Sequence, residues 1–347
     1  MTAYAFWNNK GGVGKSFLCF VAASEYAHLH PKTDVYVIDL CPQANLSEIL
    51  LGGYSNSDNL DFPITKLLKK TPRATVAGYL EARLNSPFSM ITDIEPFLCK
   101  PRNFNNKIAN NLWLVCGDSL LEILSEAIRQ TSQLSIPIDA WKQVVNWIKD
   151  LMGSCIKKSG ERETVFFLDC NPSFAVYTQL ALVAANYVIV PFTADDSSRR
   201  GIENVIALLY GVGDAHTASY AKINFAKRAK EENVDVAKLH TFVCYRQTLF
   251  NKKPSKAFQA MDSIIKKTMN HIYRDHRSLF ANPKEKPSEN FVIIPDYHSA
   301  CVVAGTTGTP LSELKAGPHT LSGERVQINL APLKRYREAF TKFTSHL

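Results

Sequence analysis

A glycine-rich run near the start of the chain, KGGVGKS at residues 10–16, constrains the fold more than any other feature. An apolar run at residues 3–7 precedes it, and an apolar, helix-like stretch at residues 17–29 follows it. A strand, a glycine-rich loop and a helix in this order form a phosphate-binding loop, because successive backbone N–H groups and the positive end of the helix surround an anion. The run therefore predicts an α/β protein that binds a phosphorylated ligand at this loop.

Other apolar runs of strand length recur along the chain. They lie at residues 35–40, 112–115, 165–168, 187–192, 241–245 and 291–294. They are continuous rather than alternating, which is typical of strands covered on both faces. Helix-like stretches, such as residues 120–130 and 177–185, separate most of them. This pattern predicts a doubly wound α/β fold, with a mostly parallel sheet and helices on both faces.

Two segments interrupt the alternation of strands and helices. Residues 53–110 are rich in Asn, Ser, Pro and scattered charge, and we expect a helical or irregular insertion there. Residues 281–290, ANPKEKPSEN, are expected to form an exposed loop. With no internal repeat and no clear linker, we expect one domain over residues 1–347.

The cysteines and the apolar segments indicate which compartment to expect. The eight cysteines form no CxxC pair, which is typical of reduced thiols in a cytoplasmic protein. Lys10 interrupts the first apolar stretch too early for a signal peptide. The most apolar window, residues 174–192, contains Gln179, Asn186 and Pro191, so we expect a buried helix followed by a strand rather than a membrane span.

The net charge of +8 is unevenly distributed. Residues 151–347 carry 26 Lys and Arg against 18 Asp and Glu, and residues 221–290 alone carry 15 against 7. A basic segment of this kind indicates a polyanionic partner, and the alternative is a basic surface that faces only solvent.

The glycine-rich run departs from the common phosphate-loop pattern, whose first glycine would fall at Asn9, and it carries a second lysine, Lys10. This variant resembles the deviant Walker A ATPases of the ParA/MinD group, and is closest to ParA-type partition proteins. Further segments resemble motifs of that group: VIDLCPQANLS at 37–47, NLWLVCGD at 111–118, VFFLDCNPS at 165–173, VIVP at 188–191 with SRRGIEN at 198–204, and IPD at 294–296 with AGTTGTPL at 304–311.

The resemblance implies a site for ATP and Mg²⁺. Lys15 would contact the β- and γ-phosphates, and Ser16 with the acids Asp39 and Asp169 would hold the metal. Lys10 would reach across a nucleotide-sandwiched homodimer to the phosphates of the partner subunit. Nucleotide contacts are expected from Gly11, Gly12, Val13, Gly14, Lys15, Ser16 and Phe17, and from Pro295 and Asp296 near the base.

One position departs from the family pattern. The second acid of the family's DxD segment, which helps to position the attacking water, is replaced here by Cys41. A thiol does not accept a proton as a carboxylate does. We therefore expect either slow ATP hydrolysis, assisted by Lys10, Lys15 and Asp39, or an ATP-binding switch with almost no turnover. The first alternative is favoured.

The resemblance also implies partners: nonspecific double-stranded DNA and a ParB-like or other adaptor, in a nucleoid-associated protein of the cytoplasm. An operator-reading N-terminal helix-turn-helix is not expected, since the first strand starts at residue 3. The candidate DNA-binding residues are Lys222, Lys227, Arg228, Lys230, Lys252, Lys253, Lys256, Lys266 and Lys267.

Two other classes stay open. In the C-terminal segment, residues 333–347, Leu333, Tyr336, Phe340 and Phe343 recur at helical spacing among basic residues. This pattern is that of a MinD-like membrane helix, or of a last helix packed on the domain, which we favour. An ATP-dependent ligase or iron–sulfur reductase on the same fold is the third class.

Overall fold

The computed structural model describes residues 1–53, 63–193, 195–213, 225–247, 249–250, 253–254 and 256–347. In this part of the chain, seven strands form one sheet in the order β3-β2-β4-β1-β5-β6-β9, and every neighbouring pair is parallel. The strands are β1 (Thr2–Phe6), β2 (Asp34–Leu40), β3 (Leu112–Val115), β4 (Thr164–Cys170), β5 (Tyr187–Phe192), β6 (Lys238–Gln247) and β9 (Phe291–Pro295). Each predicted strand is present, and the fold class is confirmed.

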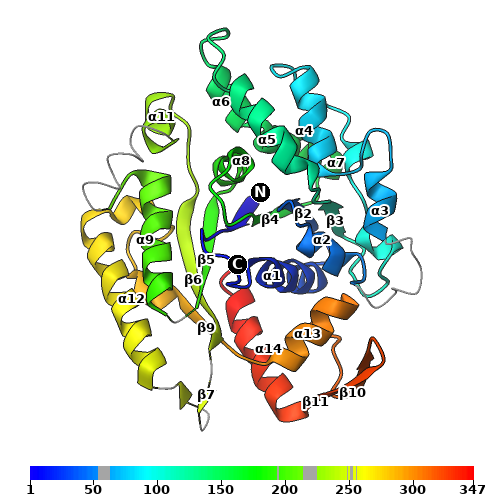
Figure 1. The fold of residues 1–347 in the computed structure, drawn as a ribbon, viewed down its shortest axis with the longest axis vertical. Coiled ribbons are helices and arrows are strands. Elements are labelled where there is room, and N and C mark those ends of the chain that lie inside the picture. Colours follow the sequence, from blue (N-terminus) through cyan, green and yellow to red (C-terminus); the bar gives the residue numbers. More distant parts are fainter. Residues whose placement is uncertain (54–62, 194, 214–224, 248, 251–252, 255) are drawn as a thin grey trace.

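Helices cover both faces of this sheet (Figure 1). One face packs against α1 (Lys15–Leu29), α2 (Asn45–Leu50), α3 (Pro63–Leu68), α13 (His298–Thr307) and α14 (Leu330–Thr344). The other packs against α4 (Val76–Asn85), α5 (Leu120–Thr131), α6 (Ala140–Val145), α7 (Trp147–Ser159), α8 (Val176–Ala184), α9 (Asp196–Tyr210), α11 (Phe225–Glu231) and α12 (Lys256–Asp275).

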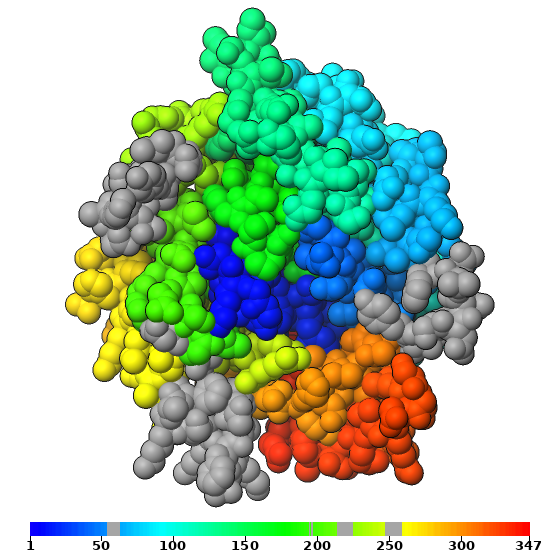
Figure 2. Space-filling view, in the orientation of Figure 1, coloured from blue at the N-terminus to red at the C-terminus, as the bar shows by residue number. Residues whose placement is uncertain are grey.

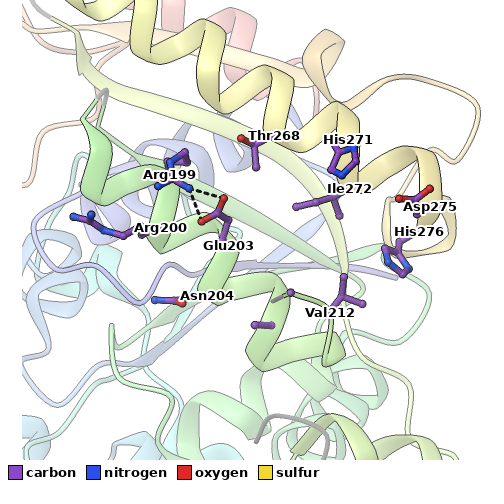
Figure 3. Close-up of a pocket in the computed structure, with 12 residues that line it drawn as sticks. Arg199, Arg200, Glu203, Asn204, Val212, Thr268, His271, Ile272, Asp275 and His276 are labelled. Carbon is purple, nitrogen blue, oxygen red and sulfur yellow. Dashed lines mark hydrogen bonds and ion pairs between the residues drawn. The ribbon is translucent and has the colours of Figure 1, made fainter. Parts of the chain in front are cut away.

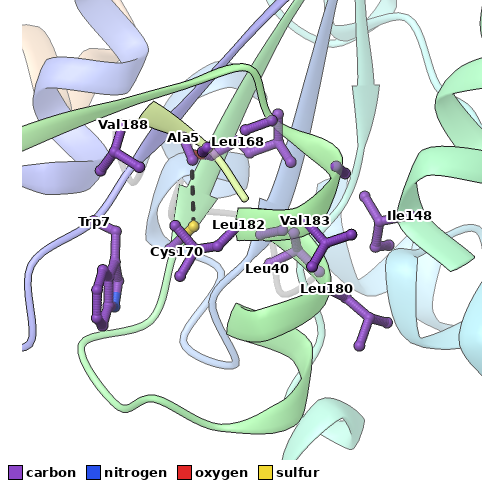
Figure 4. Packing of buried hydrophobic residues seen from close by; sticks show 14 of the residues in the cluster. Ala5, Trp7, Leu40, Ile148, Leu168, Cys170, Leu180, Leu182, Val183 and Val188 are labelled. Atoms are coloured by element: carbon purple, nitrogen blue, oxygen red, sulfur yellow. Dashed lines mark hydrogen bonds between the residues drawn. The ribbon is translucent and has the colours of Figure 1, made fainter. Parts of the chain in front are cut away.

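The continuous apolar strands divide their side chains between two cores. On β2, Tyr36, Ile38 and Leu40 join the core on the α8 side, whereas Val35 and Val37 join the core on the α1 side. Because side chains alternate along a strand, a sheet covered on both faces needs apolar residues at every position. This explains why the strands showed no polar alternation. Figure 4 shows the α8 side, where Leu40 and Cys170 pack among leucine and valine side chains.

Residues 63–110 contain α3, α4 and two short 3-10 turns, η1 (Glu95–Phe97) and η2 (Pro101–Asn103). The rest of the predicted insertion, residues 54–62, lies outside the described residues. The exposed loop predicted at 281–290 ends in another 3-10 turn, η4 (Pro287–Asn290), whose Pro287 is buried. Remaining elements are the hairpins β7 (Leu249–Phe250) with β8 (Lys253–Pro254) and β10 (Gly317–Leu321) with β11 (Glu324–Ile328), and the turn η3 (Arg277–Leu279).

The C-terminal segment forms α14, which packs on the domain. Its apolar stripe, Leu333, Tyr336, Phe340 and Phe343, is buried against the sheet and α1. A stripe covered by the protein's own core is not available to lipid, so the helix fits the packed alternative and not the membrane one. No helix in the described part of the chain is long and apolar enough to span a bilayer.

Candidate nucleotide site

The glycine-rich loop joins β1 to α1 at the edge of the sheet where the parallel strands end. Gly14 has φ 83°, in the left-handed region, and a Cβ built on it would lie 2.2 Å from the ring of Tyr245. Both the backbone conformation and the close approach therefore require glycine here. Helix α1 begins at the next residue, so its N-terminal N–H groups face the loop, as an anion site needs.

Lys15 is held above this loop. Its ammonium donates to the backbone carbonyls of Asn8 at 3.2 Å and Lys10 at 2.9 Å, and its residue is 7% exposed. Burial lowers the pKa of Lys15, and the nearby Asp169 opposes this effect. The two carbonyl bonds fix a cation beside the loop where a phosphate would sit.

Two aspartates face each other across neighbouring strands behind the loop. Asp39 on β2 is in register with Asp169 on β4, and both are fully buried. The Asp39 carboxylate accepts hydrogen bonds from the Cys41 amide, the Ser47 amide and the Ser47 hydroxyl, at 3.0, 3.0 and 2.7 Å. Burial raises the pKa of Asp39 to about 6, although these hydrogen bonds lower it in part.

Asp169 differs from Asp39 because neither of its carboxylate oxygens has a hydrogen-bond partner among the described residues. Burial, followed by the charge of Asp39, raises the pKa of Asp169 to about 8, and the positive charge of the nearby Lys15 opposes this shift. A buried carboxylate without partners is costly unless a cation completes it. Mg²⁺ typically takes one or two carboxylates together with substrate phosphates, so Asp169 and Ser16 fit such an ion. Among the described residues there is no group of three or more His, Cys, Asp or Glu that forms a metal cage by itself.

A hydrogen bond connects Ser47, on α2, to Gly117, in the loop after β3, and sequence reasoning gave neither residue a role. The Ser47 hydroxyl donates to Asp39 and accepts from the Gly117 amide at 2.8 Å. A Cβ on Gly117 would lie 2.8 Å from the carboxyl carbon of Asp39, so only glycine lets these segments approach this closely. Both residues lie in segments that resemble motifs of the ParA/MinD group, residues 37–47 and 111–118, and this resemblance is the sequence signal that could have found them.

The Cys41 thiol lies at the end of β2, 8% exposed. Burial, together with the charges of Asp39 and Asp169, raises its pKa to about 12. It therefore stays a neutral thiol at physiological pH, and a neutral thiol does not replace the carboxylate that the family carries here. All eight cysteines of the chain are free.

The second lysine of the loop, Lys10, is bonded inside its own chain. Its ammonium lies 2.7 Å from a carboxylate oxygen of Asp195, 3.0 Å from the Thr193 hydroxyl and 3.3 Å from the Ser198 hydroxyl. Burial alone raises the pKa of Asp195, but the hydrogen bonds from Lys10, Ser197 and Thr193 outweigh it and lower that pKa. Lys10 thus has hydrogen-bond partners between β5 and α9. These bonds must break before its ammonium can contact a group outside this chain.

A cavity of about 610 Å³ opens beside the loop, in the size range of ligand sites. Figure 2 shows the N-terminal part of the chain, in dark blue, at the centre of this face. The residues that line the cavity are Gly12, Gly14, Lys15, Ser16, Phe17, Cys41, Gln43, Asn45, Glu122, Cys170, Asn171, Pro172, Tyr245, Arg246 and Cys301. Gly11, Val13, Pro295 and Asp296, which were predicted to contact nucleotide, are not among them.

Tyr245, Arg246 and Cys301 instead form one wall of the cavity, and sequence reasoning missed them. The Tyr245 hydroxyl lies 3.0 Å from the Cys301 sulfur, and the Arg246 guanidinium is 5.5 Å from the centre of the Tyr245 ring. Arg246 has φ 57°, an uncommon conformation for a residue with a side chain. The wall therefore adds a cation and an aromatic ring to the cavity that Gly14, Lys15 and Ser16 also line.

Of the predicted DNA-binding residues that the structure describes, Lys253 lies on β8 and the others lie on α11 and α12, two helices that both pack on α9. On α11, Lys227 and Arg228 pair with Glu231 and Glu232, and on α12 Lys266 pairs with Asp262. Lys230 and Lys267 are exposed. Lys222 and Lys252 lie outside the described residues, as do the side chains of Lys253 and Lys256.

Beside these helices, α9 and α12 enclose a second cavity of about 650 Å³ (Figure 3). Arg199 lies there, with its guanidinium bonded to both carboxylate oxygens of Glu203 at 2.8 Å. These pairs neutralise part of the charge on the described surface of α9, α11 and α12.

Several known structures share this architecture. McdA from Cyanothece superposes with a TM-score of 0.55 at 15% identity, covering 98% of this chain and 99% of McdA. A putative plasmid partition protein from Borrelia burgdorferi, bound to AMPPNP, gives a TM-score of 0.56 at 16% identity, covering 100% and 99%. The pNOB8 ParA gives 0.50 at 15% identity, covering 84% and 80%.

In sequence, a family model described as an AAA domain matches residues 149–221. No curated protein is significantly similar to the chain. The fold and the loop thus define a P-loop α/β protein. The resemblance to the ParA/MinD group is confirmed at the level of its fold, which this chain shares with McdA and ParA-type partition proteins.

Proposed function

We propose that this protein is a ParA-type, ATP-dependent switch that dimerises with ATP, binds DNA without sequence preference and so partitions or positions a plasmid, a chromosome or another cargo. The observation that carries the proposal is the loop itself. Lys15 is fixed by the Asn8 and Lys10 carbonyls, and the same loop carries a second lysine, Lys10, whose ammonium is bonded to Thr193 and Asp195 of its own chain. Two lysines in one phosphate loop are consistent with a site shared by two subunits, in which Lys15 contacts its own nucleotide and Lys10 contacts that of the partner. In a dry interface each ammonium would offset part of the triphosphate charge.

The nucleotide is proposed to be ATP with Mg²⁺. A structural neighbour is bound to AMPPNP, and an aspartate-to-alanine variant of McdA forms a complex with ATP. Mg²⁺, when bound, would neutralise part of the charge on the β- and γ-phosphates. Asp169 and Ser16 would hold it, and Asp39 would fix the loop after β2 beside them.

Hydrolysis is proposed to be slow. The neutral Cys41 thiol stands where the family has a carboxylate, so water activation at that position is lost. Slow turnover would give the ATP-bound dimer a long life until an adaptor of the ParB kind, or another partner, stimulates release. The protein would then act in the cytoplasm, on the nucleoid.

DNA binding in the three nucleotide states tests the proposal. Fluorescence anisotropy with two unrelated duplexes would be measured with ATP, ADP or no nucleotide, at 50 and 200 mM salt, beside Lys15→Ala as the control that lacks the phosphate cation. We expect binding with ATP only, equal on both duplexes and steeply weakened by salt, because phosphate contacts act through counterion release. Binding that ignores the nucleotide, or no binding in any state, would contradict the DNA-switch proposal.

A further inference from the structure

We propose that Glu122, on α5, supplies the carboxylate that Cys41 lacks, and that it orients the water that attacks the γ-phosphate. This inference rests on the proposed ATPase function and deepens it. Of the described residues that line the nucleotide cavity, Glu122 is the one carboxylate. Asp39 and Asp169 lie behind the lining and are fully buried.

The position of Glu122 follows from the order of the strands. Helix α5 follows β3, and β3 pairs with β2, the strand that Cys41 directly follows. Because the strands are parallel, the segments that follow them open onto the same edge of the sheet, where ligands of α/β proteins bind. Glu122 is in the first turn of α5, close to the end of β3, and it lines the same cavity as Cys41.

A hydrogen-bond chain holds the Glu122 carboxylate. The buried Tyr177 donates its hydroxyl hydrogen to Glu122 at 3.1 Å, and Asn171 donates its side-chain amide to the Tyr177 oxygen at 3.0 Å. Asn171 follows Asp169 by two residues and itself lines the cavity. The chain therefore ties Glu122 to the segment beside the predicted metal acid, and preorganised groups of this kind need little rearrangement during reaction.

The other groups at this place are unsuited to the role. Cys41 carries a thiol and no carboxylate, and both oxygens of Asp39 already accept hydrogen bonds from Cys41 and Ser47. The Glu122 side chain, by contrast, is exposed in the cavity, so water reaches it. Its carboxylate accepts a hydrogen bond from that water and orients the oxygen towards phosphorus.

The step balances without another reactant. The water oxygen forms a bond to the γ-phosphorus, and the bond from phosphorus to the β–γ bridging oxygen breaks with its electron pair staying on ADP. The water proton passes to the Glu122 carboxylate and from there to the released phosphate, which leaves Glu122 ionised again.

The test is ATP turnover of Glu122→Gln in the full-length protein, with ATP affinity and thermal unfolding measured in parallel. Glutamine keeps an oxygen that accepts from Tyr177 but does not take a proton, so structure is retained while water activation is lost. Glu126→Gln, one turn further along α5, exposed and outside the cavity, is the matched control. We expect Glu122→Gln to lower turnover at least about tenfold, the low end for general-base catalysis, with ATP affinity unchanged and Glu126→Gln at the wild-type rate.

A rescue variant separates chemistry from folding. Cys41→Asp restores the family carboxylate, so we expect Cys41→Asp with Glu122→Gln to recover turnover, because the two carboxylates do one task and their effects are not additive. A structural defect at Glu122 would not be repaired by a carboxylate at position 41. Turnover of Glu122→Gln close to the wild-type rate, loss of affinity and turnover together, or failure of the rescue would overturn the inference. Wild-type protein that binds ATP without hydrolysing it would overturn this inference alone, and protein that does not bind ATP would overturn the proposed function with it.

Discussion

The Asp169 carboxylate is unfavourable for stability because it is buried, but it is suited to bind a cation. This carboxylate is buried without a described partner, so its charged form is disfavoured in the nucleotide-free protein. The unpartnered oxygens of this carboxylate are suited to bind a hydrated cation. We therefore expect Asp169 to lower the stability of the empty site while it serves the loaded one.

The pH dependence of stability tests this property. The pKa of Asp169 is raised to about 8 in the folded protein, whereas an unfolded aspartate titrates near about 4. The folded state then binds more protons between these values, so the free energy of unfolding falls as pH rises from about 4 to about 8. Asp169→Asn removes this contribution. In EDTA, we expect the melting temperature of Asp169→Asn, relative to that of the wild type, to rise between pH 5 and pH 8. A difference that stays constant over this range would show that the pKa of Asp169 is not raised in the folded protein.

Lys15 provides a second prediction for a single residue. Its ammonium is fixed by the Asn8 and Lys10 carbonyls, and charge-assisted bonds to phosphate contribute about 1.5–3 kcal/mol each. Lys15→Ala should therefore weaken ATP binding by at least about tenfold, measured with a fluorescent ATP analogue. Lys32→Ala, an exposed lysine in the turn after α1, serves as the control. Equal affinity in the two variants would remove Lys15 from the phosphate site.

How far the site could be predicted from sequence depended on where its residues lie in the chain. The phosphate loop could be predicted because its strand, glycines, lysine and helix are contiguous in the sequence, and this order is the one that a phosphate-binding loop requires. Tyr245 and Cys301 come from β6 and α13, more than 200 residues away from Gly14, and no local pattern marks them. Only folding brings that wall to the loop.

At the scale of elements, the buried strands were predictable because a continuous apolar run is a property of neighbouring residues. Residues 112–115 and 187–192 match β3 and β5 at both ends. The strand expected at 241–245 extends to Lys238–Gln247, since residues at its two ends pair with Tyr187 of β5 and Pro295 of β9. The edges of elements depend on such tertiary pairing and were less accessible to sequence reasoning.

Helix α14 gives a prediction about packing. Phe340 is 2% exposed and contacts the rings of Phe17, Tyr336 and Phe343 at centroid distances of 6.1, 5.0 and 6.4 Å. Phe340→Ala should lower the free energy of unfolding by about 3–5 kcal/mol, as for other buried phenylalanines, in denaturant titrations.

The control for this variant is Glu338→Ala, an exposed residue on the same helix, which should change stability by less than about 0.5 kcal/mol. Flotation of the wild-type protein with anionic vesicles examines the membrane alternative on the same helix. We expect no flotation with ATP. Flotation together with a stable Phe340→Ala variant would mean that α14 leaves the core to bind lipid.

At the scale of the whole molecule, the proposed switch depends on an exchange of partners by Lys10. In the single chain, the Lys10 ammonium is paired with Asp195 at 2.7 Å and bonded to Thr193 and Ser198. Contact with the nucleotide of a second subunit would replace this half-buried pair with a triphosphate in a dry interface, where a cation offsets more charge. ATP would thereby favour the dimer.

The oligomeric state in each nucleotide tests this exchange most directly. Sedimentation of the wild type and of Lys10→Ala would be measured with ATP, with ADP and without nucleotide, with Lys15→Ala as the variant that does not hold ATP. We predict that only the wild type with ATP moves from the 38.8 kDa monomer to twice that mass, whereas Lys10→Ala binds ATP and stays monomeric. A Lys10→Ala protein that dimerises with ATP as the wild type does, or a wild type that stays monomeric with ATP bound, would contradict the account.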